Sequence, residues 1–584
     1  MAARIVTFQR AQKPCLRRLS FMSSNSSRRP LDSMNRRELL GGSGALIGGA
    51  LAGMAFQSGH AAAQQKSPAK SAGAAKPPNY DPPVVQVKAG KLRGFRNGKT
   101  FTFLGIPYAE AERFELPRPV KPWDGVKNAQ VWGPVCPIPA MTMPGIDEFV
   151  FPHRYWLENE HCQVLNVWTQ SLDPKAKKPV MVWMHGGGFT NGSSMESYAY
   201  DGKNLSEFGD VVVVSLNHRL NILGTLDLSA YGAQYEKSRY TGTADLVAAL
   251  QWVQENIEAF GGDPGNVTIF GQSGGGGKVV RMMHMPVAKG LFHRVVAQSG
   301  GNLTYRDTKP AESIKAQQMI AAATLKNLNL SGNQIDQLKK VPYHDLIAAG
   351  TAALRSVAKE LGRQNMSWEV IADDDYVMRE FCDWADEIPL IAGTVFSEQF
   401  GTLHRGDGRK NEWSQQEIEA NLKAAFGDKK DEIVAEFKKA FPRMKVQDVL
   451  YFANSSRPGV KNLLARKLER SKKPVYNYIF CYEAPVNGGI TAFHCSEIAF
   501  IFHNIGEPQL KIATGATPEA FALQDKVSRA WVNFARSGDP NQPGLVWKPY
   551  TVADPQTMVF NLVSECYALR DDKLVSLMPV QRRG

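Results

Sequence analysis

A serine between glycines is the first feature of this chain that could do chemistry. Residues 271–275, GQSGG, follow a short β-rich run at 267–270 and open a glycine-rich stretch that we predict to be helical. A nucleophilic serine requires a strand, a tight turn and a helix, and flanking glycines remove Cβ clashes in that turn. We therefore predict Ser273 as the nucleophile of an acyl transfer. The structural alternative is a glycine-rich loop that packs a helix against a sheet.

A second glycine run follows the buried strand that we predict at residues 179–184. It reads HGGG at 185–188, so three successive residues expose their backbone N–H groups. Acyl transfer places negative charge on a carbonyl oxygen, and a prepositioned donor stabilises that charge by about 3 kcal/mol. We predict this oxyanion-hole role for the amides of Gly187, Gly188 and Gly274.

A hydroxyl nucleophile also needs a histidine as base and a carboxylate that orients the histidine. Around a serine turn of this kind the chain order is serine, acid, histidine. Three histidines follow the best acid candidate, namely His404, His494 and His503. His494 comes just after a glycine pair at 488–489, in a loop that could reach back over the strand ends. We predict His494 as the base.

Glu398 is the preferred acid. Residues 389–394, PLIAGT, read as a buried strand, and Glu398 falls just past its end. The acidic run at 373–375 is the rival, but a charge run is typical of a solvated surface.

At this point the chain resembles a known family, the type B carboxylesterase and cholinesterase-like branch of the α/β hydrolases. The blocks that carry the resemblance are FLGIPYA at 103–109, EHCQVLNV at 160–167 and the segment 252–273, which is the most specific. The likeness extends over roughly residues 84–575.

The resemblance implies an α/β-hydrolase fold, with a central, mostly parallel twisted sheet flanked by helices and insertions that form a cap or gorge. It implies one carboxylesterase domain over residues 84–584. It also implies the following roles: Ser273 as nucleophile, Glu398 as acid and His494 as base, Gly187, Gly188 and Gly274 as oxyanion donors, and Cys136 and Cys162 as a disulfide.

Two departures from the family pattern bear on the substrate. Many relatives carry glutamate before the serine, whereas this chain has Gln272, which removes a negative charge. No tryptophan matches the one on which cholinesterases stack a cation, since Trp156 lies at a different distance from Cys162. We expect uncharged or anionic aromatic and short-chain esters, not choline esters. Cys495, directly after the base, is interpreted as a small buried filler.

The predicted disulfide loop carries four aromatic residues. They form either one wall of an apolar acyl gorge or a patch that merely packs on the body of the domain, and the sequence favours neither. The four are Phe149, Phe151, Tyr155 and Trp156, and the cysteines without an assigned partner are Cys382, Cys481, Cys495 and Cys566.

Strand and helix patterns alternate along the chain, as in an α/β unit. Apolar residues recur at helical spacing over 244–260 and again over about 518–536, where Phe521 is among them. The run 211–216 has the length and composition of a strand covered on both faces. Residues 84–95 alternate around a turn at Ala89, as in a surface hairpin.

The first 63 residues differ from the rest and resemble an export leader. They carry nine Lys and Arg against two acids, +7 of the total +13. Arg36-Arg37, a glycine-rich apolar stretch and an alanine run fit a twin-arginine signal cleaved near Gln64, with a possible true start at Met34. We expect a flexible linker over 64–83 and a periplasmic or secreted bacterial enzyme; an organelle transit peptide is the rival interpretation.

Other classes of site lack support. No C-x-x-C pair or H-E-x-x-H motif indicates a metal, and no basic run with interleaved aromatics indicates nucleic acid. Lys278 after four glycines fails as a phosphate-binding loop, because Gln272 stands at the first glycine position and Val279 at the hydroxyl position.

The sequence predicts a serine hydrolase that cleaves carboxylic esters through an acyl-enzyme, with no cofactor and a small-molecule ester as its partner. Three alternatives stay open. They are a same-fold hydrolase for amide, carbamate, thioester or lactone bonds, a non-catalytic binding or adhesion protein, and an interfacial lipase. Oligomeric state and the physiological ester are not predicted.

Overall fold

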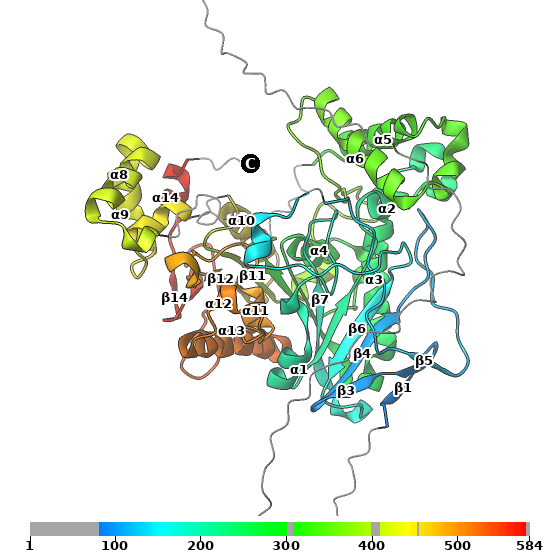
Figure 1. Cartoon of the computed structure of the whole chain (residues 1–584), viewed down its shortest axis with the longest axis horizontal. Helices are drawn as coiled ribbons and strands as arrows, with labels where there is room; N and C mark the ends of the chain where they lie inside the picture. The colour runs from blue at the N-terminus through cyan, green and yellow to red at the C-terminus, as the bar shows by residue number, and fades with distance from the viewer. Residues whose placement is uncertain (1–80, 142, 301–307, 399–408, 453–454, 580–584) are drawn as a thin grey trace, which may run out of the picture. The chain divides into compact units, whose positions relative to one another are not determined.

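A mixed sheet of 11 strands runs through the part of the chain that the structure describes, with helices on both sides (Figure 1). The computed structural model describes residues 81–141, 143–300, 308–398, 409–452 and 455–579. The predicted leader at 1–63, the start of the predicted linker and His404 lie outside the described residues. Contacts join residues Asn79–Gly584 into one unit.

The strands of the described residues are mostly short. They are β1 Val84–Val87, β2 Gly90–Arg93, β3 Phe95–Asn97, β4 Thr100–Pro107, β5 Val126–Asn128, β6 Val164–Thr169, β7 Lys178–Met184, β8 Val212–Leu216, β9 Gly262–Gln272, β10 Arg294–Gln298, β11 Leu390–Val395, β12 Val475–Phe480, β13 Gln556–Phe560 and β14 Glu565–Ala568. Of these, β6, β8, β11, β12 and β13 are buried at every residue.

The helices alternate with the strands along the chain. They are α1 Lys203–Gly209, α2 Asn221–Thr225, α3 Thr241–Asn256, α4 Gly274–Met282, α5 Pro310–Asn327, α6 Tyr343–Glu360, α8 Gln415–Phe426, α9 Lys430–Ala440, α10 Arg457–Leu468, α11 Ile498–Ile501, α12 Lys511–Thr514, α13 Pro518–Ser537 and α14 Asp572–Leu577.

The large sheet has the order β14-β13-β12-β11-β10-β9-β7-β8-β6-β4-β3. Neighbours from β8 to β13 are parallel, and the pairs at either edge are antiparallel. A parallel centre must be covered on both faces, which is why its strands read as apolar runs. The carboxyl ends of β7, β9 and β11 therefore meet at one edge. A separate small sheet has the order β1-β2-β5.

Successive side chains of β7 pack on opposite faces of the sheet, as the twofold repeat of a strand requires. Val180 and Val182 belong to the apolar cluster that contains Leu250 of α3. Trp183 belongs to the other cluster, which contains Trp531 of α13. These two layers form the core of the domain.

Most of the predicted elements are confirmed. The run at 211–216 forms β8, the run at 389–394 forms β11, and β1 and β2 make the predicted hairpin. The helix expected over 244–260 ends at Asn256 and continues as a 3-10 turn, Ile257–Phe260. Phe521 of α13 was wrongly placed on the apolar side, since it is 40% exposed.

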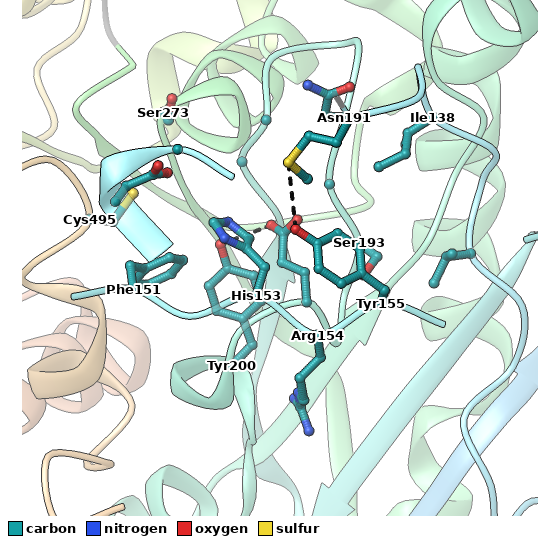
Figure 2. Close-up of a pocket in the computed structure, with 18 of the residues that line it drawn as sticks. Ile138, Phe151, His153, Arg154, Tyr155, Asn191, Ser193, Tyr200, Ser273 and Cys495 are labelled. Atoms are coloured by element: carbon teal, nitrogen blue, oxygen red, sulfur yellow. Dashed lines mark hydrogen bonds between the residues drawn. The ribbon is translucent and has the colours of Figure 1, made fainter. Parts of the chain in front are cut away.

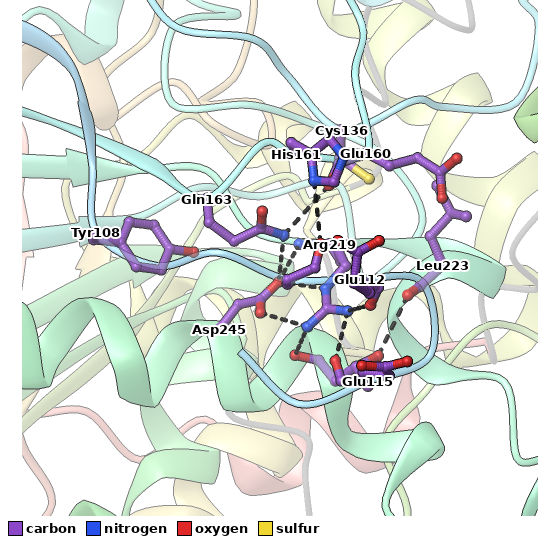
Figure 3. Close-up of polar contacts among 12 residues, drawn as sticks. Tyr108, Glu112, Glu115, Cys136, Glu160, His161, Gln163, Arg219, Leu223 and Asp245 are labelled. Carbon is purple, nitrogen blue, oxygen red and sulfur yellow. Dashed lines mark hydrogen bonds and ion pairs between the residues drawn. The ribbon is translucent and has the colours of Figure 1, made fainter. Parts of the chain in front are cut away.

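A buried ion pair ties three segments together beside this sheet (Figure 3). The guanidinium of Arg219 donates to both carboxylate oxygens of Asp245 in α3, over 2.8 and 2.7 Å. It also donates to the backbone carbonyls of Glu112 and Glu115. Bidentate pairing satisfies two buried charges that would otherwise be costly. These bonds hold the loop that contains Glu112 and Glu115, the segment after β8 and helix α3 in fixed positions relative to one another.

The two cysteines of the predicted disulfide lie against this network, but the structure holds them as free thiols. Both are buried, and a hydrogen bond links the thiols of Cys162 and Cys136. The sulfur of Cys136 also accepts the amide of Leu220 at 3.2 Å. The expected proximity is found, whereas the covalent bond is not formed here and stays a prediction.

We expect Cys136 and Cys162 to form a disulfide when the protein is made in an oxidising compartment, because the thiols are already in contact. Closing a loop of about 25 residues contributes about 3 kcal/mol in the chain-entropy account. Urea unfolding of oxidised and reduced protein measures this difference, and Cys162→Ser should unfold identically with and without reductant. Reactive thiols at both positions in oxidised, denatured protein would contradict the pairing.

Candidate active site

Ser273 occupies a strained turn between β9 and α4. Its backbone φ and ψ are 57° and −121°, a combination that a residue with a Cβ rarely adopts. Its N–H donates to the carbonyl of Gln298 at 2.8 Å, and its carbonyl accepts the amide of Gly277 at 3.0 Å. These two bonds hold the turn. The side chain is presented at the carboxyl end of the parallel strands.

The glycines around Ser273 allow two backbone segments to touch. A Cβ on Gly275 would lie 2.0 Å from the carbonyl oxygen of Met184, at the end of β7. A Cβ on Gly274 would lie 2.4 Å from the amide nitrogen of Gly188. Any side chain at either position would force the two segments apart. The turn after β9 can therefore pack against the loop after β7 only if positions 274 and 275 are glycines.

The loop after β7 carries the three glycines that the sequence singled out. Gly187 and Gly188 have φ of 77° and 63°, in the left-handed region that favours glycine. The carbonyl of Gly187 accepts the amide of Asn191 at 2.9 Å, which closes the loop into a turn. The loop passes beside Gly274, so the three amides that we predict as oxyanion donors lie on adjoining backbone.

Glu398 and His494 are brought together by a short strand-like contact between their loops. Ser397 and Phe493 form a parallel bridge, and the residue after each is the predicted acid or base. The Nδ1 atom of His494 lies 2.5 Å from Oε2 of Glu398. The other carboxylate oxygen accepts the amide of Val395 at 3.2 Å. The acid is almost fully buried, whereas His494 is partly exposed and lines the same cavity as Ser273.

Gln272 and Cys495 complete the surroundings of the histidine. The amide nitrogen of Gln272 lies 3.3 Å from both ring nitrogens of His494. Its carbonyl oxygen accepts the thiol of Cys495 at 3.2 Å. Cys495 was interpreted as a plain filler, but its thiol fixes which end of the Gln272 amide faces the ring. Burial raises the pKa of this thiol and keeps it protonated.

A second buried carboxyl, Glu497, lies next to this group, and the sequence interpretation missed it. Burial, with a smaller contribution from the charge of Glu398, raises the pKa of Glu497 to about 7. The side chain of Gln298 donates to it at 3.4 Å. Its only sequence signal is its position three residues after His494. Burial thus brings the pKa of this carboxyl close to neutral pH.

The rival candidates lie elsewhere. His503 pairs with Asp525 at 2.8 Å and stacks on Phe208. The carboxylate of Asp373 accepts three backbone amides of its own turn, and Asp374 and the residue after it are exposed. None of these side chains lines the cavity at Ser273.

The cavity in front of Ser273 has a volume of about 430 Å³. Figure 2 shows Phe151, His153 and Tyr155 projecting into it from one segment, opposite the wall that carries Ser273. Trp156 also lines the cavity. These aromatics line the cavity, as the gorge-wall interpretation predicts, whereas Phe149 is exposed and does not line it.

The wall segment is held by one carboxylate. Glu148 accepts the backbone amide of His153 at 2.9 Å, and its other oxygen lies 2.9 Å from Nδ1 of the same residue. His153 pairs as a strand-like bridge with Ser197. Further carboxylates, Glu158 and Glu196, line the cavity. The lining therefore contains more carboxylates than guanidinium groups, of which it has that of Arg154.

Lys278 lies behind the glycine loop. The ammonium is fully buried and donates to the carbonyl of His185, the first residue of the HGGG loop, at 2.9 Å. Burial lowers its pKa to about 7, Glu196 opposes this shift, and Arg281 adds to it. The sequence left Lys278 without a role after excluding a phosphate-binding loop. Its contact is with a residue 93 positions away, which no local pattern reveals.

In the described ranges no cluster of three metal-ligating side chains occurs, and none of the helices described is long and apolar enough to cross a membrane.

Comparison with known proteins gives a consistent result. The Carboxylesterase family profile matches residues 81–573. The para-nitrobenzyl esterase of Bacillus subtilis is 31% identical over 493 residues, with 82% of this chain and 94% of that protein covered. The phenmedipham hydrolase of Pseudarthrobacter oxydans is 30% identical, with 82% and 94% covered.

Solved structures agree with the sequence matches. An esterase from Clostridium hathewayi, described as able to hydrolyse aliphatic aromatic polyesters, superposes with a TM-score of 0.77 at 41% identity and covers 85% of this chain and 97% of its own. A carboxylesterase from Geobacillus stearothermophilus superposes with a TM-score of 0.64 at 31% identity, with 85% and 100% covered. The chain belongs to the carboxylesterase family of α/β hydrolases and is a type B carboxylesterase.

Proposed function

We propose that this protein cleaves carboxylic esters through an acyl-enzyme intermediate on Ser273, with His494 as general base and Glu398 as the orienting acid. The observation that carries the proposal is the 2.5 Å contact between Nδ1 of His494 and Glu398, on the wall of the cavity that Ser273 lines. A carboxylate on Nδ1 fixes the proton there, so Nε2 is the nitrogen that accepts a proton from serine.

The chemistry then proceeds in two matched halves. The Ser273 oxygen attacks the ester carbonyl while His494 takes the hydroxyl proton, and the carbonyl oxygen becomes negative. The amides of Gly187, Gly188 and Gly274 stabilise that oxygen, because they are fixed before the charge develops. The intermediate collapses, His494 gives its proton to the departing alcohol, and water repeats the sequence to release the acid.

We propose uncharged esters as substrates. The cavity combines aromatic walls with the carboxylates of Glu148, Glu158 and Glu196. An anionic ester would lie close to these carboxylates, so we no longer expect anionic esters among the substrates. The relatives named for a para-nitrobenzyl ester and for aliphatic aromatic polyesters support neutral, partly aromatic esters.

Replacement of the proposed triad residues tests the mechanism. We expect Ser273→Ala and His494→Ala each to lower kcat on a neutral p-nitrophenyl ester by at least about a thousandfold, because members of a triad act as one unit. A fluorophosphonate probe should label the wild type and not Ser273→Ala. His503→Ala is the matched control and should retain activity. Undiminished hydrolysis by purified Ser273→Ala would refute the proposal, and a wild type without adduct would favour a binding protein.

Lys278→Met tests whether the buried amine of Lys278 loses its proton near neutral pH in the folded protein. The unfolded lysine has a pKa near 10.5 and the folded one a pKa of about 7, so the unfolded state binds more protons between these values. The contribution of Lys278 to stability therefore rises with pH above about 7. Relative to the Met variant, the wild type should gain on the order of 2 kcal/mol between pH 6.5 and pH 9.

Urea unfolding of both proteins at the two pH values measures this difference. Lys326→Met, at the end of α5, is a matched control that removes an exposed lysine, and its stability difference should not change with pH over this range. A pH-independent difference for Lys278→Met would contradict a folded pKa near neutrality.

We also propose that the leader at 1–63 directs export through a twin-arginine pathway, on the basis of Arg36, Arg37 and the apolar stretch that follows. Replacing both arginines by lysine should retain the esterase in the cytoplasm of a bacterial host that has this pathway. Fractionation followed by activity assay and mass spectrometry of the mature N-terminus checks the expectation. Equal export of the double-lysine variant would contradict it.

A further inference from the structure

Six large apolar side chains are exposed between Met141 and Leu157, in the stretch of chain that supplies part of the cavity lining. We call this group the entrance rim and define it as Met141, Met143, Phe149, Tyr155, Trp156 and Leu157. Within it, Met143 is 79% exposed and Leu157 is 76% exposed. Single exposed apolar residues are ordinary on a protein surface, whereas a group beside a binding cavity marks an interaction site. The exposure of the entrance rim therefore indicates that a ligand or a partner binds there.

The polar atoms of the rim aromatics are tied to the protein. The hydroxyl of Tyr155 donates to Glu148 at 3.0 Å and lies 3.7 Å from the sulfur of Met141 (Figure 2). The indole nitrogen of Trp156 donates to the carbonyl of Trp132 at 3.3 Å. Both rings are thereby fixed before anything binds. A ligand that contacts them does not have to order them, which lowers the entropic cost of binding.

The segment beneath the rim is also anchored to the body of the domain. Arg154 donates to the carbonyl of Ser197 at 3.0 Å, and its guanidinium lies over the rings of Trp132 and Tyr198. Arg154 also donates its own backbone amide to the carbonyl of Glu196. The rim is thus built on a fixed support.

The rim is continuous with the catalytic cavity. Met141, Tyr155 and Trp156 belong to the rim and also line the cavity that contains Ser273. A cavity of about 430 Å³ holds a ligand of ordinary small-molecule size. A longer chain with its ester at Ser273 must leave the cavity across these three residues. The occupant that fits this continuity is the rest of the same substrate.

Charge restricts the chemistry of that substrate. Asp147 and Glu148 lie between Met143 and Phe149 in the sequence, and Glu158 directly follows Leu157. Carboxylates at these positions repel a phospholipid surface of negative charge and any polyanionic chain. The exposed apolar side chains of the entrance rim, together with these carboxylates, favour an uncharged chain over a polyanionic one.

From these observations we propose that the entrance rim is a second binding site, which holds the flanking units of a neutral, water-insoluble polyester chain while one ester lies at Ser273. The inference rests on the proposed esterase function and names its substrate class. A short soluble ester occupies the cavity alone and does not reach Met143 or Leu157, whereas a polymer chain contacts both.

The test compares two substrates with one set of variants of the full chain. Hydrolysis of an aliphatic-aromatic polyester film and adsorption to that film are measured beside kcat/KM on a soluble p-nitrophenyl ester. For the double variant Met143→Ser/Leu157→Ser, we expect the ratio of film rate to soluble-ester rate to fall at least about fivefold, as apolar contacts with the chain are lost. Met143→Leu/Leu157→Met, which keeps the surface apolar, should retain the wild-type ratio.

Val546→Ser/Val552→Ser is the matched control. Both valines lie between α13 and β13, each is 66% exposed, and neither lines the cavity. This double variant should leave the ratio unchanged. An equal decrease in the control would overturn the proposal, because general surface adhesion would then explain adsorption.

The remaining outcomes separate this inference from the esterase function. A wild type that hydrolyses the soluble ester but neither adsorbs to nor degrades the film overturns the rim proposal and leaves the function intact. A wild type that hydrolyses neither substrate overturns the proposed function. A concentration-dependent dimer in sedimentation, lost in the Ser variants without a change in film ratio, would assign the rim to a second copy. Equal binding to neutral phosphatidylcholine vesicles and film would assign it to a lipid surface.

Discussion

Close contact between two backbones is the constraint on which this site depends. The turn after β9 and the loop after β7 occupy the same space only because no Cβ stands at Gly275, where it would lie 2.0 Å from a carbonyl oxygen of β7. That contact sets the positions of Ser273 and the glycine amides relative to each other before any ligand arrives. Electrostatic stabilisation depends on donors that are fixed in advance. The glycines contribute because they have no side chain, which lets the two backbones pack closely and holds the amide donors in place.

The sequence predicted those parts of the molecule whose causes are local. Apolar runs covered on both faces revealed β8 and β11, and glycines revealed the turn at Ser273, because each signal lies within a few residues. Phe521 shows the limit of the same reasoning. Helical spacing placed it on the apolar face of α13, yet it is 40% exposed, because tertiary packing and not helical spacing decides which part of that face is covered.

Contacts between distant segments could not be predicted in the same way. Order along the chain identified Glu398 and His494, but the Ser397 to Phe493 bridge that joins their loops is a property of the fold. The residues around Lys278 in the sequence do not indicate its hydrogen bond to the carbonyl of His185. The aromatic segment was visible in sequence, yet which of its side chains line the cavity depends on contacts such as the hydrogen bond between Tyr155 and Glu148.

The charges around His494 show how these distant contacts act together. A base must hold its proton weakly enough to return it, and each carboxylate nearby strengthens its hold. Gln272 places a neutral amide where a carboxylate would add charge, and the thiol of Cys495 fixes its orientation. Glu497 is close enough to add charge, but burial raises its pKa to about 7. Below that pH, Glu497 is mainly neutral and adds little charge beside the imidazole.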